Sequence, residues 1–406
     1  MFNVLPYDFR YRPGRFVLLT GGLLCVVLFG HCDSGTAPSI YDPDRLSLPD
    51  PVIESVIPEG SALAGVDVVT ITGTNFSAQP ADNLVYFGDA RGDVVESSPS
   101  QIQVTAPNDP QAELDLRLAV IGAENFSNAV KYGLNPPFVD FGDVRDFEDI
   151  SGITTDPDGN LYASLTSFGA AVGIIRITPE GERSEFISSQ FPWADIEFGP
   201  DNSLFGVRSV RAVFSSSGDW SNFQFFAVIP NTTVRLTTMT IDASGRIWAA
   251  GDNTEIYSID SDKTVNAYAF EADIQDIALF QSYLYVAGVQ DEASKVWRFS
   301  IGPNGDLGAA EEWVDFASLN GSNAYALAFS QSGHLYVGTD NTEPILVIEP
   351  DGALEVLYSG VFTQPVRAFA WGLEGLLYAT TNSIDSDPAG IIRIVSRRLG
   401  YGKFGF

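Results

Sequence analysis

The stretch GITTDPDGNLY, residues 152–162, decides the fold of this chain. An alternating apolar run ends in an Asp-rich turn that contains Gly159, and an apolar–aromatic pair then opens a second strand. Related stretches recur at MTIDASGRIW (239–248), LAFSQSGHLY (327–336), FAWGLEGLLY (369–378) and, more weakly, IEFGPDNSLF (196–205) and IALFQSYLY (277–285). A strand–turn–strand unit that returns roughly every 40 residues is typical of a β-propeller blade.

Six copies of this unit follow one another, and they begin near Ile150, Trp193, Leu236, Ile274, Tyr325 and Val366. One position is apolar in every copy, as a strand wedged between neighbouring blades requires: Ile153, Ile196, Met239, Ile277, Leu327 and Phe369. Each copy leads into a third strand, which we expect at residues 223–230 in the second copy. Because a four-stranded sheet cannot bury both of its faces alone, the six copies are expected to pack around one axis.

A closed propeller leaves no exposed sheet edge, so the last blade needs an outer strand from another part of the chain. Two segments before the first copy, residues 138–142 and 144–147, are candidates, and the C-terminal GYGKFGF (400–406) competes with them. We favour closure by the N-terminal strand. In the turn of the first copy, Gly159 supplies a positive φ, and Asp156 and Asp158 are interpreted as residues that hold turn amides.

Residues 51–133 show another pattern, with short β-rich runs separated by turn residues. The runs at residues 66–76, 83–88 and 100–107 alternate apolar and polar side chains, as half-buried strands do. Strands at this spacing with no helical pattern between them predict a small β-sandwich. The carboxylates of this segment are scattered singly, and we interpret them as solvated turn residues.

In order along the chain, ITGTNF (71–76), VYFG (85–88) and VTAP (104–107) make this segment resemble an IPT/TIG domain. The resemblance implies an immunoglobulin-like fold that serves as a spacer or interaction module. Within the motif we expect Gly73 in a turn with positive φ, Asn75 hydrogen-bonded to nearby backbone, and Phe76 between the sheets. The following GLNPP, residues 133–137, is expected to form a semi-rigid hinge.

The six repeats resemble NHL-type repeats and are similar to the gluconolactonase and strictosidine-synthase-like propellers. The resemblance covers residues 150 to about 394 and depends on the turn-Gly-aromatic core. Such a core defines a fold and says little about function. The predicted fold class is therefore all-β, with an IPT/TIG sandwich (residues 51–133) followed by a six-bladed propeller (residues 138–406).

The chain is strongly acidic. Its 406 residues carry a formal net charge of -30. Because phosphate binding needs a basic surface, this charge argues against nucleic acid as a partner. It also disfavours electrostatic attachment to anionic lipid. Such a composition suits a salt-tolerant source or an ordinary acidic secreted protein, and both explanations stay open.

The N-terminus has the pattern of an export signal. Three arginines precede an uncharged apolar run at residues 16–30. This run is shorter than the ~18–20 residues that span a bilayer comfortably. Cys32 follows it and resembles the lipidation site of a bacterial lipoprotein, although His31 stands where a small residue is usual. We predict a signal peptide over residues 1–32, a lipid anchor on Cys32 and a solvated tether over residues 33–50; an uncleaved anchor or plain secretion is the alternative.

Residues near the propeller axis are the candidates for a local site. Immediately before the apolar position of each copy stand Gly152, Asp195, Thr238, Asp276, Ala326 and Ala368. We predict that Asp195, Asp276 and Asn323 line one end of the axis, with Arg367 close by. Carboxylate and amide oxygens suit Ca²⁺, so a divalent-cation site is one interpretation. The other, which we favour, is a wet channel with polar walls and no cofactor.

Trp220 is a second candidate for ligand binding. It lies in an insertion-like loop of the second copy, SSSGDWSN at residues 215–222. An aromatic ring on a polar loop can stack on a sugar, and packing back onto the blade edge is the competing interpretation. Nucleophilic catalysis has little to draw on, because both cysteines precede residue 33 and His334, in a turn, is the one histidine after it.

Together these features predict an exported, lipid-anchored binding or scaffold protein of the cell envelope, at the outer membrane or cell surface. Its propeller would recognise a glycan or a cell-envelope protein, with no nucleic acid partner and with membrane contact through the lipid anchor only. The main alternative is a divalent-cation-dependent, lactonase-like hydrolase. A structural adhesin is a third hypothesis.

Overall fold

The computed structural model describes residues 47–216, 222–316, 321–382 and 388–402. Residues 48–406 group into one compact unit. The predicted signal peptide, Cys32 and most of the predicted tether lie outside the described residues. Besides strands, the described chain has two short 3-10 turns, η1 (Pro80–Asp82) and η2 (Leu373–Gly375). No helix in the described segments is long and apolar enough to cross a membrane.

The first part of this unit is a sandwich of two sheets. One sheet has the order β1 (Val52–Ile57), β3 (Val68–Thr74), β7 (Gln101–Thr105) and β6 (Asp93–Ser98). The other has the order β2 (Ser61–Leu63), β9 (Val130–Asn135), β8 (Gln111–Val120), β4 (Asn83–Phe87) and β5 (Ala90–Arg91). Inward-facing residues of both sheets form one apolar core, in which Ile71, Val85 and Leu116 are fully buried. The predicted sandwich is confirmed.

Two of the three predictions for the ITGTNF motif are confirmed, and the one for Gly73 is wrong. Phe76 is buried in the sandwich core, and Asn75 Nδ2 donates to the Asp50 carbonyl oxygen at 2.8 Å, as expected. The positive φ predicted for Gly73 is wrong, because Asn75 is the motif residue that takes this conformation, with a φ of 63°. Gly73 allows a close approach instead: a Cβ there would lie 1.9 Å from the Val52 carbonyl oxygen.

The predicted hinge at residues 133–137 is mostly strand. Residues 133–135 belong to β9 and pair in parallel with β2. Only Pro136 and Pro137 separate β9 from β10 (Phe138–Asp140), the first strand of the propeller. The backbone of the Gly-Leu-Asn part is therefore fixed by a sheet ladder rather than free to bend.

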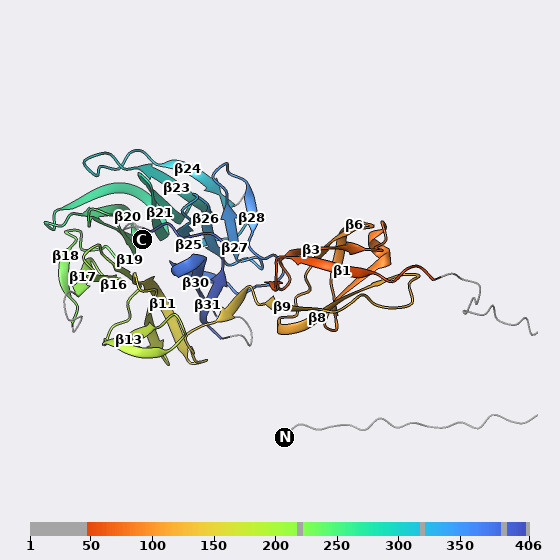
Figure 1. Ribbon diagram of the computed structural model, residues 1–406. Helices are drawn as coiled ribbons and strands as arrows, with labels where there is room; N and C mark the ends of the chain where they lie inside the picture. The colour runs from red at the N-terminus through yellow and green to blue at the C-terminus, as the bar shows by residue number, and fades with distance from the viewer. Residues whose placement is uncertain (1–46, 217–221, 317–320, 383–387, 403–406) are drawn as a thin grey trace, which may run out of the picture. The chain divides into compact units, whose positions relative to one another are not determined.

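The second part of the unit consists of six blades (Figure 1). Blade 1 has β11 (Glu148–Thr155), β12 (Leu161–Ser167), β13 (Ala170–Ile177) and β14 (Arg183–Ser188), and blade 2 has β15 (Asp195–Phe198), β16 (Leu204–Val207), β17 (Ala212–Ser216) and β18 (Gln224–Val228). Blades 3 and 4 share one six-stranded sheet of β19 (Leu236–Ile241), β20 (Ile247–Ile259), β21 (Val265–Phe280), β22 (Tyr283–Gln290), β23 (Ala293–Ser300) and β24 (Glu311–Asp315). Blade 5 has β25 (Ala324–Phe329), β26 (Leu335–Thr339), β27 (Ile345–Ile348) and β28 (Leu354–Val356), and blade 6 has β29 (Val366–Trp371), β30 (Leu376–Thr381), β31 (Gly390–Val395) and β10.

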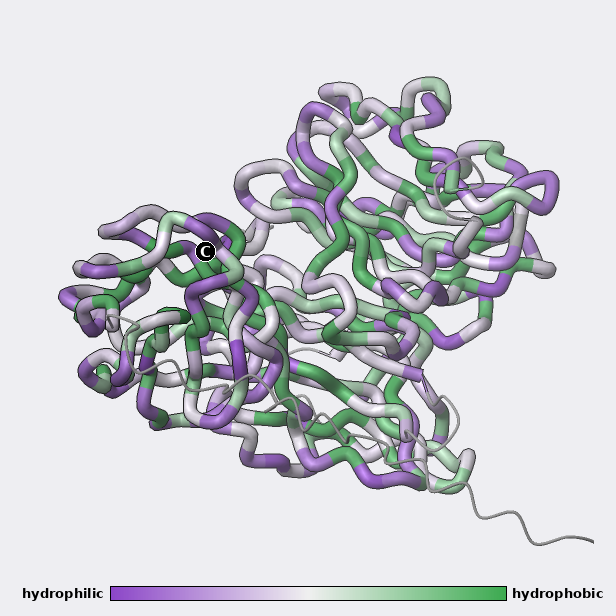
Figure 2. Tube along the Cα trace, turned by 90° about the vertical axis from the view of Figure 1, so that its right-hand side faces the viewer, coloured by the Kyte–Doolittle hydropathy of each residue, from purple (hydrophilic) through white to green (hydrophobic). Residues whose placement is uncertain are grey.

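The innermost strands of the blades form a closed ring. Each contacts the next in the cycle β11, β15, β19, the second half of β21, β25, β29 and back to β11. The register repeats from blade to blade: Ile153 pairs with Ala163, and Met239 pairs in the same way with Ala249. Five of the six apolar positions are buried, and Figure 2 shows apolar residues along the strands and hydrophilic residues at many loops. The six-bladed propeller is confirmed.

The N-terminal strand closes the ring, as predicted. β10 pairs with β31 from Phe138 opposite Ile394 to Asp140 opposite Ile392. The described C-terminal residues lie elsewhere: Gly400 forms a bridge with Ser330, and the Tyr401 ring packs on Phe280 with centroids 4.8 Å apart.

Blade 2 corrects one strand prediction. Its third strand is β17, and residues 224–228 form the fourth strand, β18. The first three residues of β17 are all buried, so this strand lacks the apolar–polar alternation that marks a half-buried strand. The loop that carries Trp220 therefore joins the third and fourth strands, and Trp220 itself lies outside the described residues.

Candidate functional site

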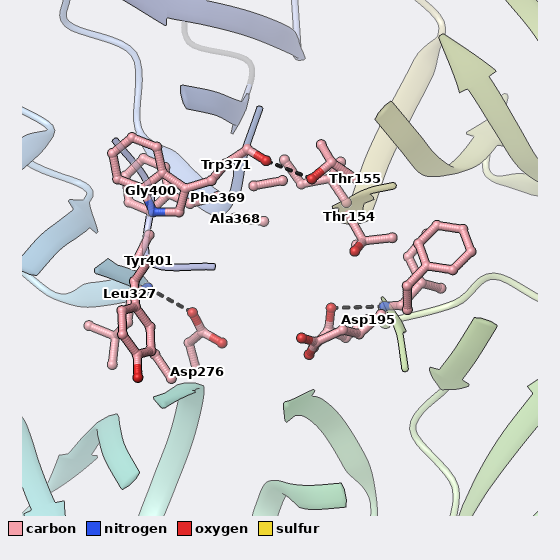
Figure 3. A pocket seen from close by; sticks show the side chains of 18 of the residues that line it. Thr154, Thr155, Asp195, Asp276, Leu327, Ala368, Phe369, Trp371, Gly400 and Tyr401 are labelled. Carbon is pink, nitrogen blue, oxygen red and sulfur yellow. Dashed lines mark hydrogen bonds between the residues drawn. The ribbon is translucent and has the colours of Figure 1, made fainter. Parts of the chain in front are cut away.

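A channel of about 680 Å³ lies between the inner strands (Figure 3). Connections between antiparallel strands alternate between the two ends of a blade. The inner strands therefore begin at one end of the channel, where Tyr325 and Arg367 line it, and finish at the other end, where Thr155 and Trp371 line it. The side chains and main-chain groups of the inner strands consequently decide what the channel can hold.

Asp195 lines the channel and joins two blades. Its Oδ1 accepts a hydrogen bond from the N–H of Ile196 at 2.8 Å. Its Oδ2 accepts from the N–H of Met239 in blade 3 at 2.9 Å. The carboxylate therefore binds the N–H of the apolar position in its own blade and the equivalent N–H in the next blade.

Asp276 repeats this arrangement two blades further on. Its Oδ1 accepts from the N–H of Ile277 at 2.8 Å and from Thr238 Oγ1 at 2.9 Å. Its Oδ2 accepts from the N–H of Leu327 in blade 5 at 2.7 Å. In Figure 3 both carboxylates face the opening. Four of the six equivalent N–H groups around the axis are thus bound by two carboxylates.

The junction between blades 6 and 1 lacks such a carboxylate. The residues at the Asp position are Ala368 in blade 6 and Gly152 in blade 1. A side chain at Gly152 would collide with blade 2, because a Cβ there would lie 2.6 Å from the Asp195 Cα. Thr155 Oγ1 instead donates to the Trp371 carbonyl oxygen at 2.6 Å and joins the two blades at the other end of the strands.

Arg367 precedes Ala368 on β29 and lines the channel. Its guanidinium carbon lies 3.5 Å from the centroid of the Tyr325 ring. Within the described residues its Nε atom is buried without a hydrogen-bond partner, and no carboxylate forms a salt bridge with it. The half-buried guanidinium therefore stacks on an aromatic ring and adds a positive charge to this part of the channel lining.

The structure brings three of the four predicted axial residues to the channel. Asp195, Asp276 and Arg367 line it, but Asn323 does not. Asn323 binds Asp340 instead, with its backbone N and Nδ2 donating to the two carboxylate oxygens at 2.9 and 2.8 Å. Among the described residues, no group of three or more His, Cys, Asp or Glu side chains is arranged to hold a metal ion. Whether the predicted residues bind a ligand stays a prediction.

The turn carboxylate of the first repeat has a structural function. Asp156 Oδ1 accepts from the N–H groups of Asp158 and Asn160 at 3.0 and 2.9 Å, and its Oδ2 accepts from the Tyr162 hydroxyl at 2.9 Å. Gly159 has a φ of 82°. The interpretation of Asp156 as a turn-building residue is confirmed.

Sequence reasoning missed the contribution of the C-terminal segment to the channel. Residues 399–402 line it. The Tyr401 N–H donates to the Phe329 carbonyl oxygen at 2.8 Å, and the Tyr401 hydroxyl accepts from the Gln281 N–H at 3.1 Å. The aromatic residues of GYGKFGF (400–406) are visible in the sequence, but their pattern indicates a closing strand and gives no sign of a place in the channel lining.

Comparisons with known proteins support both parts of the fold. Residues 51–132 match the family described as IPT/TIG domain, and no curated protein matches the chain. A putative phosphatase from Bacteroides thetaiotaomicron VPI-5482 has a TM-score of 0.55 at 12% identity, covering 87% of this chain and 98% of its own. An auxiliary nutrient binding protein from the same organism has a TM-score of 0.52 at 12% identity, covering 87% and 98%.

A third solved structure, described as a putative gluconolactonase, has a TM-score of 0.51 at 13% identity and covers 65% of this chain and 93% of its own. At such identities the similarity shows the fold alone. The chain therefore has an IPT/TIG domain at residues 51–132, followed by a six-bladed propeller whose fold is similar to that of the putative gluconolactonase.

Proposed function

We propose that this protein is a binding protein of the bacterial cell envelope and that its propeller channel takes up a glycan. One observation carries the proposal: a channel of about 680 Å³ whose lining combines polar residues with the aromatic residues Tyr325, Trp371 and Tyr401. This volume is typical of small-molecule sites, and aromatic faces with convergent polar groups suit sugar rings. The similar fold of a protein described as an auxiliary nutrient binding protein supports a binding function.

Exposed aromatic rings support an extended ligand. Phe168, between β12 and β13, is 82% exposed and stacks on Phe147 with centroids 4.5 Å apart. Phe191, between blades 1 and 2, is also exposed, and Arg208 lies over its ring at 4.1 Å. Strand alternation puts both connections at the end of the propeller where Arg367 lies. A polymer held in the channel would continue over these rings.

Affinity electrophoresis against soluble polysaccharides, followed by titration calorimetry with oligosaccharides, tests this proposal. Gln275 lines the channel, so Gln275→Trp should abolish binding. Gln224 lies exposed on the outer strand of blade 2, and Gln224→Trp is the matched control that should bind normally. Phe168→Ala should weaken long ligands more than short ones, and Trp220→Ala tests the predicted loop contact. Glycan binding that Gln275→Trp leaves intact would locate the site elsewhere, and no binding to any polysaccharide would reject a glycan as the ligand.

The proposed location rests on the N-terminal sequence. Cleavage before Cys32 and lipidation of its amine and thiol would tether the domains to a membrane. Such an anchor needs no electrostatic attraction between anionic lipid and a chain of net charge -30. Mass spectrometry of the mature N-terminus should show a lipidated Cys32, and Cys32→Ser should release the protein from the membrane fraction. An intact Met1 in the mature protein would contradict this.

A lactonase-like hydrolase is the second candidate, because Asp195 and Asp276 face one opening, as ligands of a divalent cation would. Their hydrogen bonds to main-chain N–H groups also give both carboxylates a structural function. Thermal stabilisation by Ca²⁺ together with lactone hydrolysis, both lost in Asp195→Asn, would favour the hydrolase. Glycan capture without turnover would favour the binding protein.

A further inference from the structure

The carboxylates around the channel follow a rule that one junction breaks. In blades 2 and 4, an Asp on the inner strand accepts the N–H of the residue after it and the N–H of the equivalent residue in the next blade. The rule predicts a third Asp in blade 6, at position 368, that would bind the N–H groups of Phe369 and Ile153. The chain has Ala368 there.

The two N–H groups at this junction are placed like the four that are bound. Phe369 pairs with Ala379 and Ile153 with Ala163, in the register of Leu327 with Val337 and Met239 with Ala249. Both residues line the channel. Within the described residues, no side chain accepts a hydrogen bond from either N–H group. Donors that face a channel favour an acceptor from outside the chain.

The charge near this junction also differs from that at the other two. Arg367 stands directly before Ala368, its guanidinium carbon lies 3.5 Å from the centroid of the Tyr325 ring in blade 5, and its Nε atom is buried without a partner among the described residues. The equivalent residues in blades 2 and 4, Ala194 and Gln275, carry no charge. A carboxylate at the junction would receive two main-chain N–H donors, as those of Asp195 and Asp276 do, and hydrogen bonds to an ionised acceptor are the strong ones. The Arg367 guanidinium, over the Tyr325 ring, would add longer-range attraction.

We propose that the junction between blades 6 and 1 binds a ligand carboxylate, which takes the place that the Asp side chain holds in blades 2 and 4. The inference rests on the proposed glycan-binding function and narrows the ligand to an acidic sugar. Its uronate carboxylate accepts from the N–H groups of Phe369 and Ile153, and the guanidinium of Arg367 attracts it from the side of blade 5. The aromatic residues of the channel contact the sugar ring. Asp195 and Asp276 are already bound to main-chain donors and serve as internal models of the contact.

Titration calorimetry with D-glucuronate, and with D-glucose as its neutral counterpart, tests the carboxylate contact on the full mature chain. Glucuronate should bind at least tenfold more tightly than glucose, and its affinity should fall as NaCl rises. Arg367→Gln should reduce the affinity for glucuronate more than the affinity for glucose and weaken its dependence on NaCl, with partial recovery in Arg367→Lys. Equal binding of both sugars, or no binding of glucuronate, would overturn the inference.

Two substitutions at position 368 distinguish the effect of an internal carboxylate acceptor from steric blocking of the site. Ala368→Asp should supply the third internal carboxylate, raise the melting temperature of the ligand-free protein and abolish glucuronate binding. Ala368→Val fills similar space without an acceptor, so it should block binding without raising the melting temperature. Normal glucuronate binding by Ala368→Asp would overturn the inference. Binding of neutral glycans that Gln275→Trp abolishes would still support the proposed function, so the two failures are distinguishable.

Discussion

The junction between blades 2 and 3 and the junction between blades 6 and 1 have the same backbone register. They differ in that only the first has an Asp carboxylate to accept the main-chain N–H groups. At the first, Asp195 holds two main-chain N–H groups of neighbouring blades. At the second, Ala368 supplies no acceptor, and the equivalent residues Phe369 and Ile153 line the channel. A repeat architecture offers the same position six times, so a change at one copy can convert a stabilising contact into a binding contact. Four changes test how far this comparison extends.

The largest effect is expected where a carboxylate binds most donors. Asp276→Ala removes the acceptor of Ile277, Leu327 and Thr238, and three orphaned donors should lower the free energy of unfolding by about 4 kcal/mol. Asp195→Ala, which removes the acceptor of the Ile196 and Met239 N–H groups, should cost less. Urea denaturation measures both, and Asp276→Asn, which keeps one acceptor oxygen, is the matched control. Equal loss of stability in Asp276→Asn and Asp276→Ala would show that hydrogen bonding is not the cause.

Gly152 represents a third kind of junction, where two backbones meet without a side chain between them. A Cβ at this position would lie 2.6 Å from the Asp195 Cα and 2.9 Å from the Ile196 nitrogen. Gly152→Ala should therefore lower the free energy of unfolding by about 3 kcal/mol through overpacking. Gly390→Ala is the control for the loss of a glycine, because φ there is not positive and the nearest atom to an added Cβ, Thr381 Oγ1, lies 3.8 Å away. A neutral Gly152→Ala would show that blades 1 and 2 can move apart.

Blade 1 has its own stabilising carboxylate, which lies away from the axis. Glu148 accepts from Arg183 Nη1 and Nη2 at 2.7 and 2.8 Å, and this hydrogen bonding lowers the pKa of Glu148 below its usual value. A depressed native pKa gives stability that is present above the unfolded value of about 4.3 and is lost as pH falls through the native value. Glu148→Gln should cost about 2 kcal/mol at pH 7, because a buried ion pair loses one charge.

Urea denaturation from pH 7 to pH 3 measures the Glu148 effect. The difference between the wild type and Glu148→Gln should shrink as pH falls below about 4, because the wild-type carboxylate then becomes protonated. Asp276→Asn serves as the reference from the axis, where neutral donors rather than an arginine hold the carboxylate. A constant difference at all pH values would mean that the charge on Glu148 does not contribute.

The smallest effect is expected at the side chain that joins blades 6 and 1. Thr155→Val removes the hydrogen bond from Thr155 Oγ1 to the Trp371 carbonyl oxygen and should lower the free energy of unfolding by about 1 kcal/mol. The strand β10 also stabilises this blade, so the loss should stay small. Thr154→Val is the control, because the side chain of this neighbouring threonine makes no hydrogen bond to any residue that the structure describes. A loss as large as that of Asp276→Ala would show that this one bond, rather than β10, holds the ring closed.

Periodicity made most of the fold predictable. The repeated features are the apolar position, the turn and the aromatic residue after it. They recur because each blade packs between two neighbouring blades in the same way. The prediction failed at two places where tertiary contacts override the local pattern. The strand β17 is buried without apolar–polar alternation. At position 73 a glycine is needed because a Cβ would collide with the neighbouring strand β1, and not because φ is positive.

The sequence by itself determined the blades, the sandwich and the alignment that put Asp195, Asp276 and Arg367 near one axis. It could not place Asn323, which is held by Asp340 outside the channel lining. Only the tertiary structure decided which N–H each carboxylate binds, because those donors belong to blades some 40 to 50 residues away along the chain. For the same reason, the consequence of having Ala368 in place of Asp depends on ring closure. Only in the closed ring do Phe369 of blade 6 and Ile153 of blade 1 line the same channel.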